Sequence, residues 1–322
     1  MKTTHGQRPF DARPGLIRKL LAILAWPTIA LSVVLVALLN WPLPEMPSPG
    51  VTGDFVVRNV AIVDVVNDRI VPGRDVVVRN GRIDSIGASL PVIGQRGLVV
   101  VDGTGKFLIP GLWDMHVHSL KMSPQYTHPL SIAKGITGVR EMWGCPSLAD
   151  GFVACGEDIE RWRAELQDRS RLAPRYIMRS SFAINGEQGV PSAAPAFFKA
   201  RNADEAQALV AHHAADGVDL LKTYTNVSVA TYGALAAEAS RHGLLVAGHL
   251  PVRVPLGMAI AAGQHSVEHP RVFLFECYRG AAGFRALPDP MAAYTADMRL
   301  RFIDEHDPVR CAELMAAMAA SD

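Results

Sequence analysis

The sequence GKFLIPGLWDMHVH, residues 105–118, marks the point at which the pattern of the chain changes. Before it, from Phe55 onward, the sequence is rich in valine and alternates between apolar and polar residues, which is typical of β-strands. Asn80-Gly81 lies between two of these segments and predicts a tight hairpin in a small β unit. After it, short apolar segments alternate with helical ones, which predicts βαβ units and a parallel sheet. The stretch ends in His116 and His118, and a strand here would place both imidazoles on one face.

Six apolar segments after Pro110 are predicted to be strands of this sheet. Helical sequence separates the last three, and each of these helices closes at a glycine: Gly217, Gly243 or Gly263. The repeated units predict an α/β protein with a (β/α)8-type barrel, of which about six strands are present. The predicted strands are 112–118, 136–143, 175–184, 218–224, 244–250 and 265–270.

Chemistry-bearing side chains gather at the carboxyl ends of these strands, where barrel enzymes keep their active sites. Any one of the histidines is best explained as a hydrogen-bonded core residue, but together they predict a divalent metal site. Lys222 lies inside the apolar segment VDLLKTY, where a buried ammonium is costly without a partner or a chemical change. The candidate ligands are His116, His118, Lys222, His249 and His269.

The chain resembles the amidohydrolase superfamily over roughly residues 54–322, and within it the branch of imidazolonepropionase-like enzymes and Xaa-Pro or Xaa-Arg dipeptidases. The motifs that carry the resemblance are GKFLIPGLWDMHVH, GITGVREMWG, GVDLLKTY, VAGHLP and AGQHSVEHP, in this order. The resemblance implies a metal-dependent hydrolase of carbon–nitrogen bonds in small amides, cyclic amides or dipeptides, with a metal-activated water as the nucleophile.

The resemblance also implies a ligand set for two divalent metal ions, usually zinc. His116 and His118 would bind the buried ion, and His249 and His269 the more exposed one. Lys222, carboxylated by CO2, would bridge both ions, which turns a buried cation into a carboxylate ligand. Histidine and carboxylate ligands suit zinc, manganese and iron alike.

Two further expectations concern residues around that centre. Tyr224, two residues after the lysine, is a candidate substrate contact. The family also has an aspartate at the end of the eighth strand that binds metal and acts as general base, and no residue here matches it. Asp304, Asp307 and Asp322 lie in or beside helical sequence. No catalytic residue beyond the ligands is therefore identified, and we expect a C-terminally truncated member that is unstable and inactive alone.

The N-terminus predicts a membrane anchor at 20–40, because Leu20–Leu39 is apolar and about as long as a bilayer core is thick. Basic residues gather before it, which predicts a cytoplasmic segment 1–19 and a single-pass protein whose catalytic domain is extracytoplasmic. A cleaved signal peptide is the rival interpretation. A proline-rich linker at 41–53, a β-sandwich portion at 54–110 and the incomplete barrel at 111–322 would follow.

Composition supports a folded protein: 49% of the 322 residues are hydrophobic and 20% are charged. The net charge is +1 and no basic stripe is present, which argues against nucleic acid as a partner. The four cysteines form no CxxC pair, so a thiolate zinc site is not expected. For Cys145 and Cys155, a disulfide and two free thiols are both left open.

Two rival functions remain at this level. The same scaffold and metal centre serve lactone or phosphotriester hydrolysis, and a substrate panel would separate these reactions. A non-catalytic, membrane-tethered remnant is the second rival, favoured by the missing aspartate and opposed by the five retained ligand positions.

Overall fold

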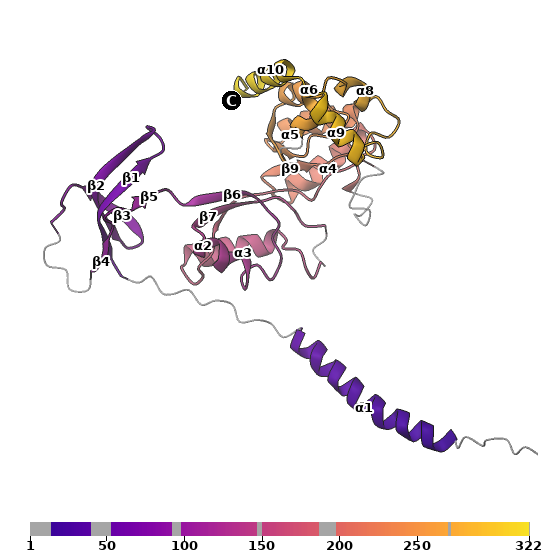
Figure 1. Ribbon diagram of the computed structural model, residues 1–322, viewed down its shortest axis with the longest axis horizontal. Helices are drawn as coiled ribbons and strands as arrows, with labels where there is room; N and C mark the ends of the chain where they lie inside the picture. Colours follow the sequence, from indigo (N-terminus) through magenta and orange to yellow (C-terminus); the bar gives the residue numbers. More distant parts are fainter. Residues whose placement is uncertain are drawn as a thin grey trace, which may run out of the picture. The chain divides into compact units, whose positions relative to one another are not determined.

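The computed structural model of the chain describes residues 14–39, 53–91, 98–146, 150–186, 198–269 and 272–321. It divides into two compact units, residues 1–45 and 46–322. The first contributes one described element, the helix α1 (Pro14–Leu39), and the second holds every other helix and strand (Figure 1).

The predicted transmembrane helix is wrong. No helix in the described ranges combines the length and the apolar character that crossing a bilayer requires. α1 takes in the basic residues Arg18 and Lys19 and has Pro27 inside it. The same finding overturns the predicted single-pass localisation with an extracytoplasmic domain. The proline-rich linker predicted at 41–53 lies, apart from Gly53, outside the described residues.

The N-terminal part of the second unit is one mixed β-sheet with the order β3-β2-β1-β4, in which β5 also pairs with β1. The strands are β1 (Phe55–Asp64), β2 (Arg69–Arg79), β3 (Arg82–Gly87), β4 (Val99–Asp102) and β5 (Phe107–Leu108). Asn80 and Gly81 both have positive φ, at 50° and 73°, as the predicted hairpin turn requires. The described residues here form a single sheet instead of the expected sandwich, because β4 and β5 extend the edge of β1.

All six predicted barrel segments contain a parallel strand, although Pro270 at the end of the last one is not described. β6 (Leu112–Val117), β7 (Ile136–Glu141) and β8 (Arg175–Arg179) form one three-stranded sheet. β9 (Leu220–Thr223), β10 (Leu245–Gly248) and β11 (Gln264–Val267) form a second. The protein is therefore α/β with two partial sheets, and no pairing of β6 with β11 closes a barrel among the described strands.

Backbone hydrogen bonds connect the two parallel sheets at one point. Ser181 N donates to Leu220 O at 2.8 Å, and Ile184 N donates to Lys222 O at 2.8 Å. Isolated parallel bridges join Ser180 to Leu220 and Ile184 to Thr223. The segment after β8 therefore runs beside β9, so the six strands follow one another in chain order and their carboxyl ends face the same side.

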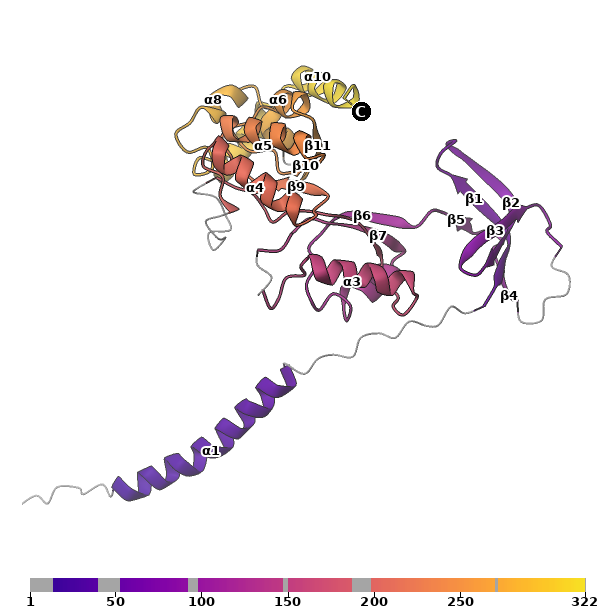
Figure 2. The ribbon, with the colours of Figure 1, turned by 180° about the vertical axis from the view of Figure 1, so that it is seen from behind.

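Helices cover these sheets and hold their cores. α2 (Thr127–Ala133) and α3 (Gly156–Gln167) lie beside the β6–β8 sheet (Figure 1). Trp162 of α3 is buried in a cluster with Tyr176 and Val139. α4 (Ala203–Ala215), α5 (Val229–Arg241) and α6 (Leu256–Ala261) accompany β9–β11 and share the larger core (Figure 2). The predicted stops Gly217, Gly243 and Gly263 all have positive φ.

Among the described residues, four helices follow β11. They are α7 (Val272–Glu276), α8 (Ala281–Arg285), α9 (Ala296–Asp304) and α10 (Pro308–Ala319). Phe302 of α9 is fully buried and contacts Phe275, Tyr278 and Phe284. Asp307 caps α10 by accepting from the backbone N–H groups of Val309 and Arg310. These helices extend the core that supports β9–β11.

Candidate metal centre

Lys222 is the most deeply buried of the predicted ligands, with a relative exposure of 2%. It lies in β9, and its backbone N–H donates to Ser181 Oγ at 2.9 Å. Its ammonium donates to the Met142 carbonyl and lies 3.4 Å from Nε2 of His118. Burial lowers the pKa of Lys222 to about 8, although the negative charges of Glu141 and Glu268 oppose that shift.

His116 lies in β6 and His118 directly follows it, and a spacing of two residues places both side chains on one face of an extended chain. Their Nε2 atoms lie 3.3 Å apart and their ring centroids 5.2 Å apart. Burial, followed by the charge of Lys222, lowers the pKa of His118 to about 4. The imidazole of His118 is therefore neutral at physiological pH, which is the form that binds a metal.

His249 and His269 approach the same point from β10 and β11. His249 directly follows β10 and is buried, and its Nδ1 lies 3.1 Å from the Thr225 hydroxyl. His269 sits in a bend after β11 with φ of 70°, a backbone conformation that is uncommon for a residue with a side chain. Its ring centroid is 4.8 Å from that of His249 and 4.9 Å from that of His116. The four imidazoles thus form a continuous chain of ring contacts.

Tyr224, the predicted substrate contact, stacks on one ring of this chain. Its ring lies 4.1 Å from that of His249, centroid to centroid, with an interplanar angle of 24°. The side chain is half-buried. His249 also lines a pocket with a largely apolar wall. The lining residues are Thr225, His249, Leu250, Val252, Glu268, Phe275, Phe284, Met291 and Tyr294.

Sequence reasoning missed Glu268, which stands beside the candidate ligand His269. Its Oε2 lies 2.7 Å from Nδ1 of His116, and its Oε1 accepts from Ser266 Oγ at 2.8 Å and forms an ion pair with Arg140. Burial would raise the pKa of Glu268, but these hydrogen bonds and the Arg140 charge hold it down at about 2. The signal was present in the motifs GITGVREMWG and AGQHSVEHP, which each place a charged residue at the end of an apolar strand.

Sequence reasoning also missed Glu141, the charged residue that ends β7. It is 1% exposed and accepts backbone hydrogen bonds from Ser119 at 2.8 Å and from Trp143 at 2.6 Å. Burial raises the pKa of its carboxyl group, and these hydrogen bonds act against that rise. Glu141 therefore fixes the backbone on both sides of the site, next to His118 and next to the Met142 carbonyl that Lys222 contacts.

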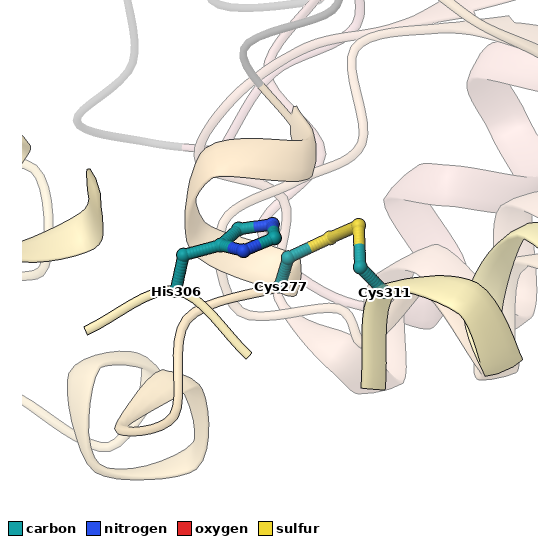
Figure 3. A group of neighbouring side chains, drawn as sticks. All are labelled: Cys277, His306 and Cys311. Carbon is teal, nitrogen blue, oxygen red and sulfur yellow. A yellow bond between two sulfur atoms is a disulfide. The ribbon is translucent and has the colours of Figure 1, made fainter. Parts of the chain in front are cut away.

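A second cluster of potential ligand atoms lies away from these strands. Sulfur and nitrogen atoms of Cys277, His306 and Cys311 lie within 4.8 Å of one another (Figure 3). However, Cys277 and Cys311 are joined in a disulfide, so neither offers a thiolate. Cys145 and Cys155 are also disulfide-bonded, which decides between the two states left open by the sequence.

The residues at the strand ends fit a divalent cation by their chemistry. Imidazole nitrogens are common ligands of zinc, iron and manganese. The remaining group is a buried lysine, and no carboxylate among the described residues forms a hydrogen bond with its ammonium. The centre thus combines four imidazoles with a buried amine whose pKa is lowered by its surroundings.

Comparison with proteins of known function gives short sequence matches and longer structural ones. No family model matches the chain. It is 40% identical over 65 residues to adenine deaminase 3 of Rhizobium meliloti, which covers 20% of this chain and 11% of the relative. It is 38% identical over 143 residues to the dihydroorotase of Carboxydothermus hydrogenoformans, covering 42% of this chain and 30% of the relative. The chain thus spans well under two thirds of these relatives.

Among solved structures, the chain resembles a putative prolidase from Bifidobacterium longum with a TM-score of 0.53 and 20% identity, over 79% of this chain and 68% of that one. It resembles a Xaa-Pro dipeptidase with bound methionine with a TM-score of 0.53 and 18% identity, over 68% and 62% of the two chains. These likenesses show a shared fold. Together with the sequence matches, they are consistent with the resemblance to the amidohydrolase superfamily.

Proposed function

We propose that the chain carries the metal centre of a hydrolase that cleaves carbon–nitrogen bonds in small amides, cyclic amides or dipeptides. One observation carries this proposal: four imidazoles from three strands and the buried Lys222 meet at the carboxyl ends of the sheets. The relatives support the reaction class, since an adenine deaminase, a dihydroorotase and prolidases all act on carbon–nitrogen bonds.

In this proposal His116, His118, Lys222, His249 and His269 hold two divalent ions, with zinc as the first choice. Bound ions of this kind supply a nucleophilic water at neutral pH and polarise the carbonyl that is attacked. The chain's own contribution includes the neutral imidazole of His118, whose pKa is lowered by burial and by the charge of Lys222.

We propose further that Lys222 is carboxylated. A neutral amine attacks CO2 and releases one proton, and the product is a carbamate with a negative charge. The lowered pKa of about 8 leaves a useful fraction of Lys222 in the neutral form near physiological pH. Carboxylation would also remove a buried ammonium whose described polar contacts are one carbonyl and one imidazole.

The pocket beside His249 supports a substrate with an apolar group next to the scissile bond. Phe275, Phe284 and Tyr294 provide an apolar wall, and Thr225 and Glu268 provide polar groups close to His249. Tyr224 would contact the substrate from the face of His249 on which it stacks. Small pockets with an apolar lining and a few polar groups are typical of small-molecule sites.

The test uses the full chain, purified with zinc and bicarbonate, and the variants Lys222→Ala and Lys106→Ala. Lys106 is an exposed lysine of the β layer and serves as the matched control. We expect about two zinc equivalents by elemental analysis, and after 13CO2 a carbamate carbon signal by NMR, both lost in Lys222→Ala and kept in Lys106→Ala. Zinc content equal in all three proteins would overturn the assignment. A panel of dipeptides, cyclic amides, lactones and phosphotriesters would define the reaction.

A further inference from the structure

The two ring nitrogens of His116 have different neighbours. Nδ1 lies 2.7 Å from the Glu268 carboxylate, and Nε2 lies 3.3 Å from Nε2 of His118. Glu268 comes from the end of β11 and is distant in sequence from His116 on β6. A neutral imidazole has one N–H donor and one acceptor nitrogen, and an ionised carboxylate only accepts. The proton of neutral His116 therefore belongs on Nδ1, which leaves the Nε2 lone pair directed toward His118.

Glu268 is itself held in place on its other oxygen. Arg140 forms an ion pair with Oε1, and Ser266 donates to the same oxygen at 2.8 Å. Arg140 is 3% exposed and also donates through Nε to the Met115 carbonyl at 2.7 Å and through Nη1 to Ser266 Oγ at 3.0 Å. Met115 immediately precedes His116 on β6, so Arg140 fixes both the carboxylate and the backbone next to the imidazole.

We propose that Glu268, anchored by Arg140, is a positioning residue that fixes His116 in the Nδ1–H tautomer and presents Nε2 toward His118. The importance of this tautomer for metal binding rests on the proposed function, in which His116 is a ligand. The assignment of the tautomer itself is independent of the proposed function, because it follows from the contacts of His116 with Glu268 and His118. Residues that hydrogen-bond the second nitrogen of a metal-binding histidine orient the ring and increase its basicity.

The arrangement at His249 provides an internal contrast. Its Nδ1 lies 3.1 Å from the hydroxyl of Thr225, which can both donate and accept a hydrogen bond. This contact does not involve Glu268, so it should persist when Glu268 is changed. Its signals therefore report on whether the surrounding fold is intact.

The variant Glu268→Gln makes the sharpest test, because it keeps the shape of the side chain. Arg140 can only donate, so the glutamine must turn its carbonyl oxygen toward Arg140 and its NH2 group toward His116. That NH2 group requires an acceptor at Nδ1, and the proton of His116 then moves to Nε2. We therefore expect Glu268→Gln to reverse the tautomer, and Glu268→Asp to keep the Nδ1–H form.

The experiment is long-range 1H–15N correlation NMR of the metal-free full chain with labelled histidine at pH 8, with His116 assigned through His116→Asn. Wild type and Glu268→Asp should show Nδ1 as the protonated nitrogen, and Glu268→Gln should show Nε2. The surface variant Glu160→Gln, whose exposed carboxylate pairs with Arg163, should leave the spectrum unchanged. An Nε2–H signal for His116 in wild type would overturn the proposal. It would also be overturned if His116 had the same tautomer in wild type and in Glu268→Gln while the signals of His249 were unperturbed.

Zinc titration of the same proteins separates this inference from the proposed function. We expect zinc affinity to fall about 10–100-fold in Glu268→Gln and to recover in Glu268→Asp. If the tautomer reverses but zinc affinity does not change, His116 is not a ligand, and the positioning role stands without the proposed function. If the NMR spectrum of Glu268→Gln shows that this variant does not fold, Ser266→Ala takes its place. Ser266→Ala removes one hydrogen bond to Glu268 and should weaken the preference of His116 for the Nδ1–H tautomer.

Discussion

Nζ of Lys222 lies 3.4 Å from Nε2 of His118, and both side chains have strongly lowered pKa values, about 8 and about 4. Each lowering begins with burial, and the charge of Lys222 adds to the shift at His118. The pair therefore places the buried Lys222 ammonium next to a neutral imidazole. This contact determines the first prediction.

The first prediction concerns stability in alkaline, CO2-free buffer without metal. The folded state loses the Lys222 proton near pH 8, whereas an unfolded chain keeps it until about pH 10.4. Between these values the unfolded state binds more protons, so stability rises with pH, by on the order of 2–3 kcal/mol in total. Lys222→Met should remove this rise, as measured by urea unfolding at pH 8 and pH 10. An equal rise in Lys222→Met would refute the assignment.

The second prediction concerns acid. His128 is 1% exposed, and burial together with the charge of Arg171 lowers its pKa to about 4. An unfolded histidine binds its proton near pH 6.5, so stability is lost as pH falls from about 6.5 to about 4. His118 and His213 have the same shift and should contribute to this loss. Thermal unfolding from pH 7 to pH 4.5 should show a weaker slope in His128→Gln than in wild type.

The third prediction concerns the two disulfides. Cys277–Cys311 links residues 34 positions apart, and Cys145–Cys155 links residues 10 positions apart. In the loop-entropy account, the longer loop stabilises by about 3–4 kcal/mol and the shorter one by about 2–3 kcal/mol. The double variant Cys277→Ala/Cys311→Ala should therefore unfold at lower urea concentration than Cys145→Ala/Cys155→Ala. The reverse order would show that local packing outweighs chain entropy here.

The fourth prediction concerns Tyr224, which stacks on His249 with a centroid distance of 4.1 Å. Tyr224→Phe keeps the ring, whereas Tyr224→Ala removes it and exposes one face of the imidazole. For whichever substrate the panel identifies, we expect Tyr224→Ala to raise KM several-fold more than Tyr224→Phe. Equal values for the two variants would assign the contact to the hydroxyl group instead of the ring.

The strands and most helix ends could be predicted because local sequence determines them. The glycines at 217, 243 and 263 end helices in a conformation that other residues rarely adopt, and the apolar segments around Lys222 and His249 can only be buried strands. The convergence of the predicted ligands follows from the parallel arrangement of these strands. Their roles as metal ligands remain a prediction.

Other features depend on contacts that a linear pattern does not reveal. The pairing of Glu268 with Arg140 and His116 joins residues more than a hundred positions apart, and each is an ordinary charged residue in its own motif. The sandwich was wrong because strand alternation does not show whether later strands extend one sheet or form a second layer. The membrane span was wrong because no helix in the described ranges is both long and apolar enough to cross a membrane.

The most direct test of the central claim is X-ray absorption spectroscopy at the zinc edge on the zinc-loaded full chain. We predict nitrogen and oxygen ligands only, with imidazole scattering and a zinc–zinc distance of about 3.5–4 Å, as expected for two ions that share Lys222 and four histidines. A sulfur shell would instead place zinc at Cys277 and Cys311 after reduction of their disulfide. That result, or the absence of bound zinc, would contradict the account.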